Sequence, residues 1–348
     1  MSTEANVPQC SAVLVIPHLR VQNANAISSP MTWGFPAITA FTGLMTALER
    51  RLGREAGIAF LGVGIVCHGF EAQVTTSGYT RAFHLTRNPV QADGSTAGIV
   101  EEGRAHLDLT LIFDVLLDDT HRSDAEAQVL ADRVAHELAA MRLAGGSIMP
   151  PLPGKSRLPV RARIELRPDG AQDEACRQQF RRLARRWLPG FTLVARDDLL
   201  RDRLVKLRET EPQASALDAW LDLASWTRRA VQHPPKEGEI APTVEWVDDA
   251  RVGWTVPIPV GFAALSPLHA AGSVAGARDT DVPFRFVETI WSIGQWISPH
   301  RLQGLDQFFW YPVTEPDAGS DAENTPNLYR CRNDFAPTPH APTANLSA

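Results

Sequence analysis

The chain has 348 residues, of which 44% are hydrophobic and 21% are charged, as in a globular protein of one or two domains. No apolar run reaches the roughly 18 residues of a membrane span, and the polar segment 1–11 lacks the pattern of a signal peptide. We therefore expect a cytoplasmic protein without a membrane partner. The four cysteines, at positions 10, 67, 176 and 331, form no C-x-x-C pair, so we expect neither a disulfide scaffold nor a metal site.

The net charge of −6 is distributed unevenly along the chain. Residues 155–208 contain 15 Lys and Arg against 7 Asp and Glu, a local charge of +8, which leaves −14 for the remainder. Because the local field decides where a polyanion binds, the negative total does not exclude a nucleic-acid partner.

The first 150 residues show the periodicity of short strands and two helices. The expected elements are a strand at 12–16, a polar loop, a helix at 36–51, strands at 62–75 and 105–117, a helix at 123–141 and a short extended segment at 147–149. Ser123 and Glu126 form a capping box that begins the second helix, and Gly145-Gly146 ends it. This order predicts an α+β fold of the ferredoxin-like or RNA-recognition type over residues 10–150.

An arm at residues 76–103 separates two of these strands. Turn signals at Asn88-Pro89 and Asp93-Gly94 predict that it protrudes as a hairpin.

Residues 151–314 are expected to form a second, mixed α/β region. Proline-rich stretches at 149–159 and 233–242 indicate boundaries or insertions. The elements expected around them are helices at 172–187, 217–231 and 285–297 and a strand at 254–262. The polar segment 315–348, rich in Pro, Asn and Ser, is expected to be poorly ordered.

A long motif near the N-terminus carries a resemblance to a known family. It runs Pro17-His18-Leu19-Arg20-Val21-Gln22-Asn23-Ala24-Asn25-Ala26-Ile27-Ser28-Ser29-Pro30 and continues as Thr32-Trp33-Gly34-Phe35-Pro36. Further matching stretches are 64–68, 85–89, 93–96, 100–107, 141–148, 188–191, 285–288 and 298–301. Across roughly residues 14–310, the chain resembles the family of second Csy proteins of type I-F CRISPR systems.

The resemblance implies a member of the RAMP superfamily, built on RNA-recognition-like folds with a Gly-rich loop after a helix. It implies a subunit without catalytic residues that clamps the 5′ handle of crRNA and pairs with the large subunit of the surveillance complex. It also implies that the arm contacts the adjacent backbone subunit and that target DNA is met through the assembled complex. The proline-rich stretches and the segment after Glu315 depart from the family, so nothing is carried over to them.

The loop after the first strand collects candidate RNA-binding residues. They are Asn23, Asn25, Ser28, Ser29, Thr32 and Trp33. Amides and hydroxyls can read base edges or 2′-hydroxyl groups, and an indole can stack on an unpaired base. The alternative is that the polar groups satisfy a tight loop and that Trp33 belongs to the core.

Two basic segments are further candidates for RNA contact. In the arm, Arg81, His84 and Arg87 are interleaved with apolar residues, so one face of the hairpin can follow phosphates. The helix at 172–187 has an apolar stripe, and its other positions hold Arg177, Arg181, Arg182, Arg185 and Arg186. A polyanion would relieve the repulsion on this helix. The alternatives are a solvated arm, and a helix face that is solvated or paired with an acidic partner subunit.

Three matched stretches complete the candidate set. Arg142 with Gly145 and Gly146 resembles the Gly-rich loop of the superfamily, in which backbone N–H groups approach phosphates, although two glycines also end many helices. Arg104 and the pair His300-Arg301 are candidates for phosphate contact, with salt bridges or helix capping as the alternative.

The main alternative function is a metal-independent endoribonuclease, because some RAMP relatives cleave the CRISPR repeat. His18, His68, His84 and His106 are available as general bases, but the sequence pairs none of them with a second catalytic group. The sequence contains no Walker loop, H-E-x-x-H or G-x-S-x-G motif, so we expect neither a metabolic enzyme nor a cofactor. A protein scaffold without RNA contact is the third possibility.

Overall fold

The computed structural model describes residues 10–87, 90–121, 123–150, 161–168, 173–226, 228–234, 242–248, 251–277, 279–313 and 328–337. The α-helices in these ranges are α1 (Ile38–Leu52), α2 (Asp124–Ala139), α3 (Asp173–Arg186), α4 (Asp197–Arg208) and α5 (Ala216–Ala224). Short 3-10 turns are η1 (Arg54–Ala56), η2 (Asp119–His121) and η3 (Pro299–Arg301).

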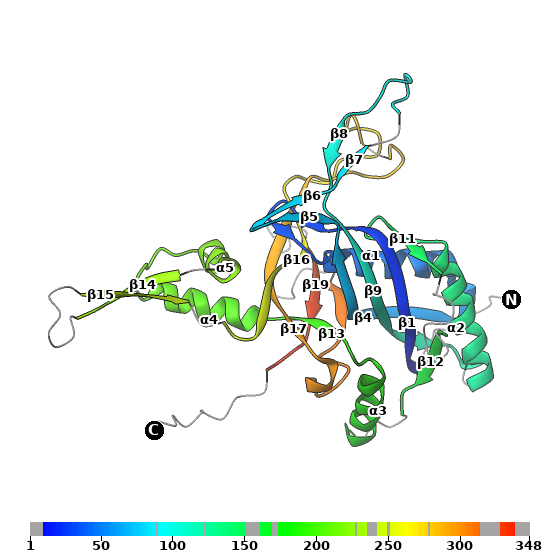
Figure 1. Ribbon diagram of the computed structural model, residues 1–348. Coiled ribbons are helices and arrows are strands. Elements are labelled where there is room, and N and C mark those ends of the chain that lie inside the picture. Colours follow the sequence, from blue (N-terminus) through cyan, green and yellow to red (C-terminus); the bar gives the residue numbers. More distant parts are fainter. Residues whose placement is uncertain are drawn as a thin grey trace.

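An antiparallel sheet forms the centre of the molecule (Figure 1). Its strands are β1 (Cys10–Asn25), β4 (Ile58–Ala72), β9 (Arg104–Leu117), β10 (Arg142–Leu143), β11 (Gly146–Met149), β12 (Arg163–Leu166), β13 (Phe191–Ala195), β16 (Trp254–Ala264), β17 (Val287–Ile297), β18 (Trp310–Val313) and β19 (Leu328–Asn333). The other strands form two-stranded hairpins: β2 (Ile27–Ser29) with β3 (Thr32–Trp33), β5 (Val74–Ser77) with β6 (Thr80–Phe83), β7 (Leu85–Arg87) with β8 (Ile99–Glu101), and β14 (Arg228–His233) with β15 (Thr243–Asp248). The predicted α+β class is confirmed.

The N-terminal part of the sheet has the strand order β11-β1-β9-β4. The apolar strands β1, β4 and β9 pair over most of their length, with Leu14 opposite Phe113 and Ile65 opposite Leu111. β1 is longer than predicted, because the register shifts between Ile16 and Leu19 and again between Val21 and Ala24 let it continue through the expected polar loop. The remainder of that loop forms the β2–β3 hairpin.

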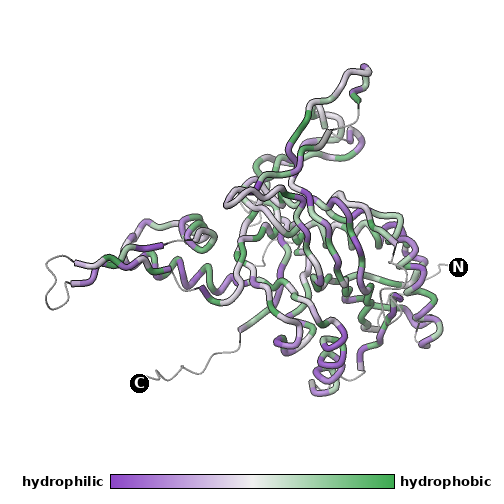
Figure 2. The backbone as a smooth tube through the Cα atoms, in the orientation of Figure 1, coloured by the Kyte–Doolittle hydropathy of each residue, from purple (hydrophilic) through white to green (hydrophobic). Residues whose placement is uncertain are grey.

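Helices α1 and α2 cover one face of this sheet (Figure 1). The apolar side chains of α1 and α2 pack on inward residues of β1, β4 and β9, which explains their helical periodicity. Ser123 caps α2 by accepting a hydrogen bond from the Glu126 backbone N–H and donating its hydroxyl proton to the Glu126 carboxylate. Figure 2 shows hydrophobic positions concentrated in the sheet.

Helix α3 packs on the other face, toward the end of the sheet remote from the arm. Phe180, Leu183 and Trp187 are buried with Val13 and Ile112, so the predicted apolar stripe of this helix is confirmed.

The C-terminal region extends the same sheet and differs from prediction in three places. Residues 287–297 form strand β17, not a helix, because β16 and β13 pair with its two edges. The helix expected at 217–231 ends at Ala224, and β14 begins at Arg228. Residues 328–333 form β19, so the expectation of a poorly ordered tail is wrong for this part. The other tail residues and most of both proline-rich stretches lie outside the described ranges.

Two parts extend away from the sheet (Figure 1). The predicted arm contains β5, β6, β7 and β8, and a lobe made of α4, α5, β14 and β15 extends to the left in this view. Trp220 of α5 anchors the lobe by donating a hydrogen bond from Nε1 to the Ser292 carbonyl of β17. Within the described ranges, no helix is long and apolar enough to cross a membrane.

Candidate nucleic-acid interface

A polar groove lies where the arm leaves the sheet. We call it the arm-base groove and define it by two adjoining hollows that share Glu102, Arg104 and Gly145. The first hollow, about 320 Å³, is lined by Gln22, Asn23, Gln73, His84, Glu102, Arg104, Arg142, Gly145 and Ser147. The second includes Asn25 and Ser28. The groove therefore joins seven of the residues selected from the sequence, although they come from β1, the β2–β3 hairpin, the arm, the start of β9, and β10 with the turn that follows it.

The two glycines of the predicted Gly-rich loop have different local roles. Ala144 and Gly145 have φ of 48° and 75° and form the two-residue turn between β10 and β11. Gly146 is buried against β1, where an added Cβ would lie 2.7 Å from both the Gln22 carbonyl oxygen and the Ala24 backbone nitrogen. Gly146 therefore permits strand pairing, whereas Gly145 lines the groove.

The cations of the groove are held by local hydrogen bonds. Arg104 donates hydrogen bonds from Nε at 3.0 Å and Nη2 at 2.8 Å to Glu102 Oε2, and both side chains are about 30% exposed. Arg142 donates from Nη1 to the Gly145 carbonyl at 3.3 Å and is exposed. The guanidinium groups are thus oriented and remain accessible to an anion.

The polar residues of the N-terminal loop are mostly used within the protein. The Asn25 amide donates to the Ile27 carbonyl at 2.8 Å and accepts from the Ile27 N–H at 3.1 Å. The hydroxyl of Thr32 lies 2.8 Å from that of Ser28 and 2.6 Å from that of Ser29. Because Ser29 and Thr32 are buried, we assign their hydroxyl groups a structural role within the hairpin. Asn23, in contrast, is exposed, with φ of 57°, and its backbone N–H donates to His106 Nδ1.

Trp33 connects the hairpin to the arm. Its ring is 44% exposed and stacks on Phe83, with 5.8 Å between the ring centroids. This indole is therefore not a core residue. Arg81 is exposed on β6, and the side chain of Arg87 lies outside the described part of the structure.

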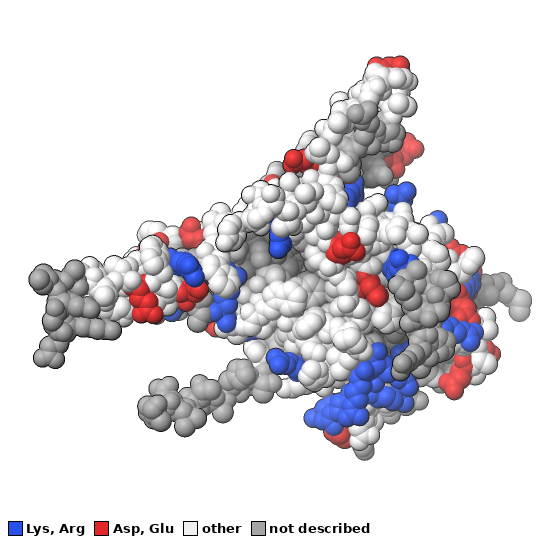
Figure 3. Space-filling view, viewed as in Figure 1, with Lys and Arg blue, Asp and Glu red and all other residues white. Residues whose placement is uncertain are grey.

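A positively charged region lies at the opposite end of the sheet. The α3 basic surface consists of Arg177, Arg181, Arg182, Arg185 and Arg186 together with the neighbouring His300 and Arg301 of η3. Figure 3 shows the arginines of α3 as a continuous patch. The structure thus separates the sequence candidates into two sites, because the arm extends toward the top of Figure 1 and α3 lies at the bottom.

Acidic side chains neutralise part of the α3 basic surface. Glu165 of β12 accepts from Arg182 at 2.7 Å and from Arg186 at 3.0 Å, and Glu174 pairs with Arg181 at 3.4 Å. Arg185 is exposed and has no ion pair within the described residues. Five arginines facing two carboxylates leave the surface positive.

Sequence reasoning missed a histidine pair formed by His18 of β1 and His68 of β4. The rings of His18 and His68 lie 4.4 Å apart, and His18 Nδ1 lies 3.0 Å from Asp108 Oδ1. His68 Nδ1 donates to the Pro189 carbonyl at 2.6 Å, which leaves Nε2 to accept from the Thr110 hydroxyl at 2.7 Å. Burial lowers the pKa of His68. Strand pairing of β1, β4 and β9 creates this pair, so spacing in the sequence gave no signal of it.

Sequence reasoning also missed Gln22, Gln73 and Ser147 of the groove. Each is a common polar residue. Gln22 and Ser147 are placed by the register of β1 with β11, and Gln73 lies in the link between β4 and β5, so the sequence alone does not bring them together. Among the described residues, no group of three or more His, Cys, Asp and Glu side chains is placed to hold a metal ion.

Comparison with known proteins agrees with the resemblance. The family model described as CRISPR-associated protein (Cas_Csy2) matches residues 14–331. A curated relative, CRISPR-associated protein Csy2 of Pseudomonas aeruginosa (strain UCBPP-PA14), is 47% identical over 325 residues, covering 93% of this chain and 98% of the relative. The chain therefore belongs to the Csy2 family of CRISPR-associated proteins, which confirms the type I-F assignment made from its sequence motifs.

Proposed function

We propose that this protein is a cytoplasmic, non-catalytic subunit of the type I-F Csy surveillance complex and that it binds the 5′ handle of crRNA in the arm-base groove. The observation that carries the proposal is the convergence of Asn23, His84, Arg104 and Arg142 on one groove from separate elements. Amide, imidazole and guanidinium donors beside a turn with accessible backbone suit single-stranded RNA.

The strand order of the sheet supports an RNA-recognition-like fold. The order β11-β1-β9-β4, with α1 and α2 on one face, supports a split βαβ sheet of the ferredoxin-like type. Such sheets serve as RNA platforms in RNA-recognition modules. RAMP membership is part of the same proposal.

The assembled complex would supply the remaining partners. The arm is the element proposed to reach the adjacent backbone subunit. On the lobe, Val231, Val244 and Trp246 are exposed on β14 and β15, with Trp246 64% exposed. A two-stranded hairpin exposed on both faces has little stability alone, which supports pairing of the lobe with the large subunit.

The α3 basic surface is proposed as a contact for crRNA or, through the complex, target DNA.

A binding titration tests the proposal. The full chain is co-expressed with its proposed large-subunit partner and titrated with labelled 5′ handle RNA or a scrambled RNA of equal length over a salt series. We expect tighter binding of the handle RNA, affinity that falls as salt rises, and intact RNA on a denaturing gel. Equal affinity for both RNAs would contradict handle recognition.

The His18–His68 pair beside Asp108 gives the endoribonuclease a specific observation in its favour. A neutral imidazole close to a carboxylate can act as a general base. Both ring nitrogens of His68 are already occupied by Pro189 and Thr110, however, which favours a structural role for it. Metal-independent cleavage that disappears in His18→Ala would establish the nuclease instead.

A further inference from the structure

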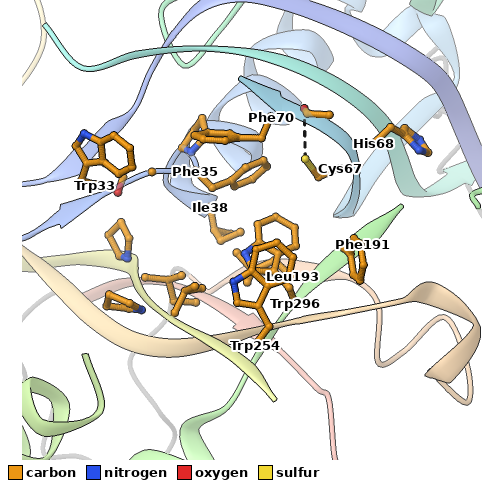
Figure 4. Close-up of a pocket in the computed structure, with 18 residues that line it drawn as sticks. Trp33, Phe35, Ile38, Cys67, His68, Phe70, Phe191, Leu193, Trp254 and Trp296 are labelled. Atoms are coloured by element: carbon orange, nitrogen blue, oxygen red, sulfur yellow. Dashed lines mark hydrogen bonds between the residues drawn. The ribbon is translucent and has the colours of Figure 1, made fainter. Parts of the chain in front are cut away.

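An aromatic cavity of about 470 Å³ lies beside the arm-base groove. Figure 4 shows Trp33 and Phe70 on one side of it, Trp254 and Trp296 on the other, and Ile38 between them. It is lined by Cys67–Phe70 of β4, which pairs with β13 at Val66 and Cys67, and by residues of β16 and β17.

We propose that this cavity receives one unstacked nucleobase of the bound RNA, a role that rests on the proposed function and extends it. Aromatic rings line opposite sides of the cavity, and several of them meet one another edge-on. Phe191 meets Trp254 at 74° with 5.5 Å between centroids, and Phe35 meets Trp296 at 86° with 4.9 Å. A planar base gains stacking energy from such walls, whatever its identity.

The polar groups of the cavity suit an uncharged ligand that accepts hydrogen bonds. The residues that line it include no Lys, Arg, Asp or Glu. The indole N–H groups of Trp33, Trp254 and Trp296 have no hydrogen-bond partner within the described residues. Nucleobases carry carbonyl oxygens and ring nitrogens that accept from such donors, while a phosphate would have to leave water without a cation to compensate.

The cavity adjoins the groove, which favours RNA as the occupant. Ser28 and Pro36 line both the cavity and the second hollow of the arm-base groove, which also contains Arg104. In the proposed complex, a backbone held by Arg104 lies close to the cavity, and one base turns inward while its phosphates stay outside.

A scan of 2-aminopurine along the handle RNA tests this role. We expect the fluorescence of the probe to change on binding in a distinct way at one position only. At that position, an abasic nucleotide should weaken binding to the full chain by roughly tenfold. Trp254→Ala should abolish the position-specific signal and show the same roughly tenfold loss with intact RNA, whereas Trp254→Phe should retain both. Trp254 is 57% exposed, so its removal is not expected to unfold the chain.

The matched control is Phe286→Ala, which removes a 50% exposed aromatic ring that does not line the cavity. Handle binding without any position-specific signal, or unchanged affinity in Trp254→Ala, would overturn the base-binding role alone. Absence of handle binding by the wild-type chain would overturn the proposed function as well. If Trp254→Ala spares RNA affinity but releases the co-purified protein partner, the cavity holds a protein side chain and the proposal is wrong.

Discussion

Glu102 accepts two hydrogen bonds from the guanidinium group of Arg104 in the arm-base groove, at 3.0 and 2.8 Å. This pair orients Arg104, but it also places a negative charge where a phosphate would approach. Glu102→Gln should therefore strengthen binding of handle RNA about two- to fivefold at low salt, with a smaller gain at high salt.

The measurement is a titration of handle RNA over a salt series with the wild type, Glu102→Gln and a control variant. Glu211→Gln makes the same charge change at an exposed position after α4 and should leave affinity unchanged. Weaker binding by Glu102→Gln would mean that orientation of Arg104 matters more than removal of the negative charge.

The α3 basic surface should contribute charge without sequence preference. Replacing Arg181 and Arg185 together with Ala removes two exposed cations whose side chains do not enter the core. Each lost phosphate contact should reduce the slope of log affinity against log salt by roughly 0.7 for a single strand. Handle and scrambled RNA should lose affinity equally, and an unchanged slope would remove this surface from the RNA path.

Gly146→Ala should destabilise the fold. The new Cβ would meet β1 backbone atoms at 2.7 Å, which the paired strands can relieve only by moving apart. We expect a loss of about 2 kcal/mol in the free energy of unfolding, measured by denaturant titration. Gly98→Ala is the control, because nothing lies within 4 Å of a Cβ placed there. Equal stability of the two variants would contradict the close approach of β11 to β1.

Stability should depend on pH through His68. Burial, the largest effect, holds the pKa of His68 below its ordinary value of 6.5. The hydrogen bond to the Pro189 carbonyl raises the pKa in part, the neighbouring His18 lowers it again, and Asp108 has a smaller raising effect. The unfolded chain therefore takes up this proton at higher pH than the folded chain. The contribution of neutral His68 to the free energy of unfolding is therefore complete above about pH 6.5, and it is lost as pH falls toward the pKa of His68 in the folded chain.

Thermal melts across this interval check the sign. His68→Gln keeps a donor and an acceptor but cannot titrate, so its melting temperature should fall less on acidification than that of the wild type. A parallel fall in both proteins would assign the pH dependence to other groups.

Periodicity predicted the elements that bury one face. The apolar alternation of β9, the stripe of α3 and the capping residue Ser123 are local signals, and the structure confirms all three. β17 was predicted as a helix because Val287, Ile290, Trp291 and Gly294 also fit helical spacing. Pairing with β16 and β13 decides its conformation, and partners that distant in sequence leave no local signal.

The candidate site was predictable in composition but not in arrangement. Exposed Asn23 and Arg142 meet partly buried Arg104 in one groove, while burial assigns Ser29 and Thr32 to the hairpin itself. The aromatic cavity was not foreseen, because Trp33 lies more than 200 residues before Trp254 and Trp296 in the chain and only the fold brings the three together.

The most direct test of RNA binding in the arm-base groove compares Arg142→Gln with Arg201→Gln. Both remove one exposed arginine, but only Arg142 lines the groove, and Arg201 lies on α4. With handle RNA at fixed salt, we expect Arg142→Gln to bind roughly tenfold more weakly than the wild type and Arg201→Gln to match it. Wild-type affinity in Arg142→Gln, or an equal loss in both variants, would contradict the placement of the RNA in this groove.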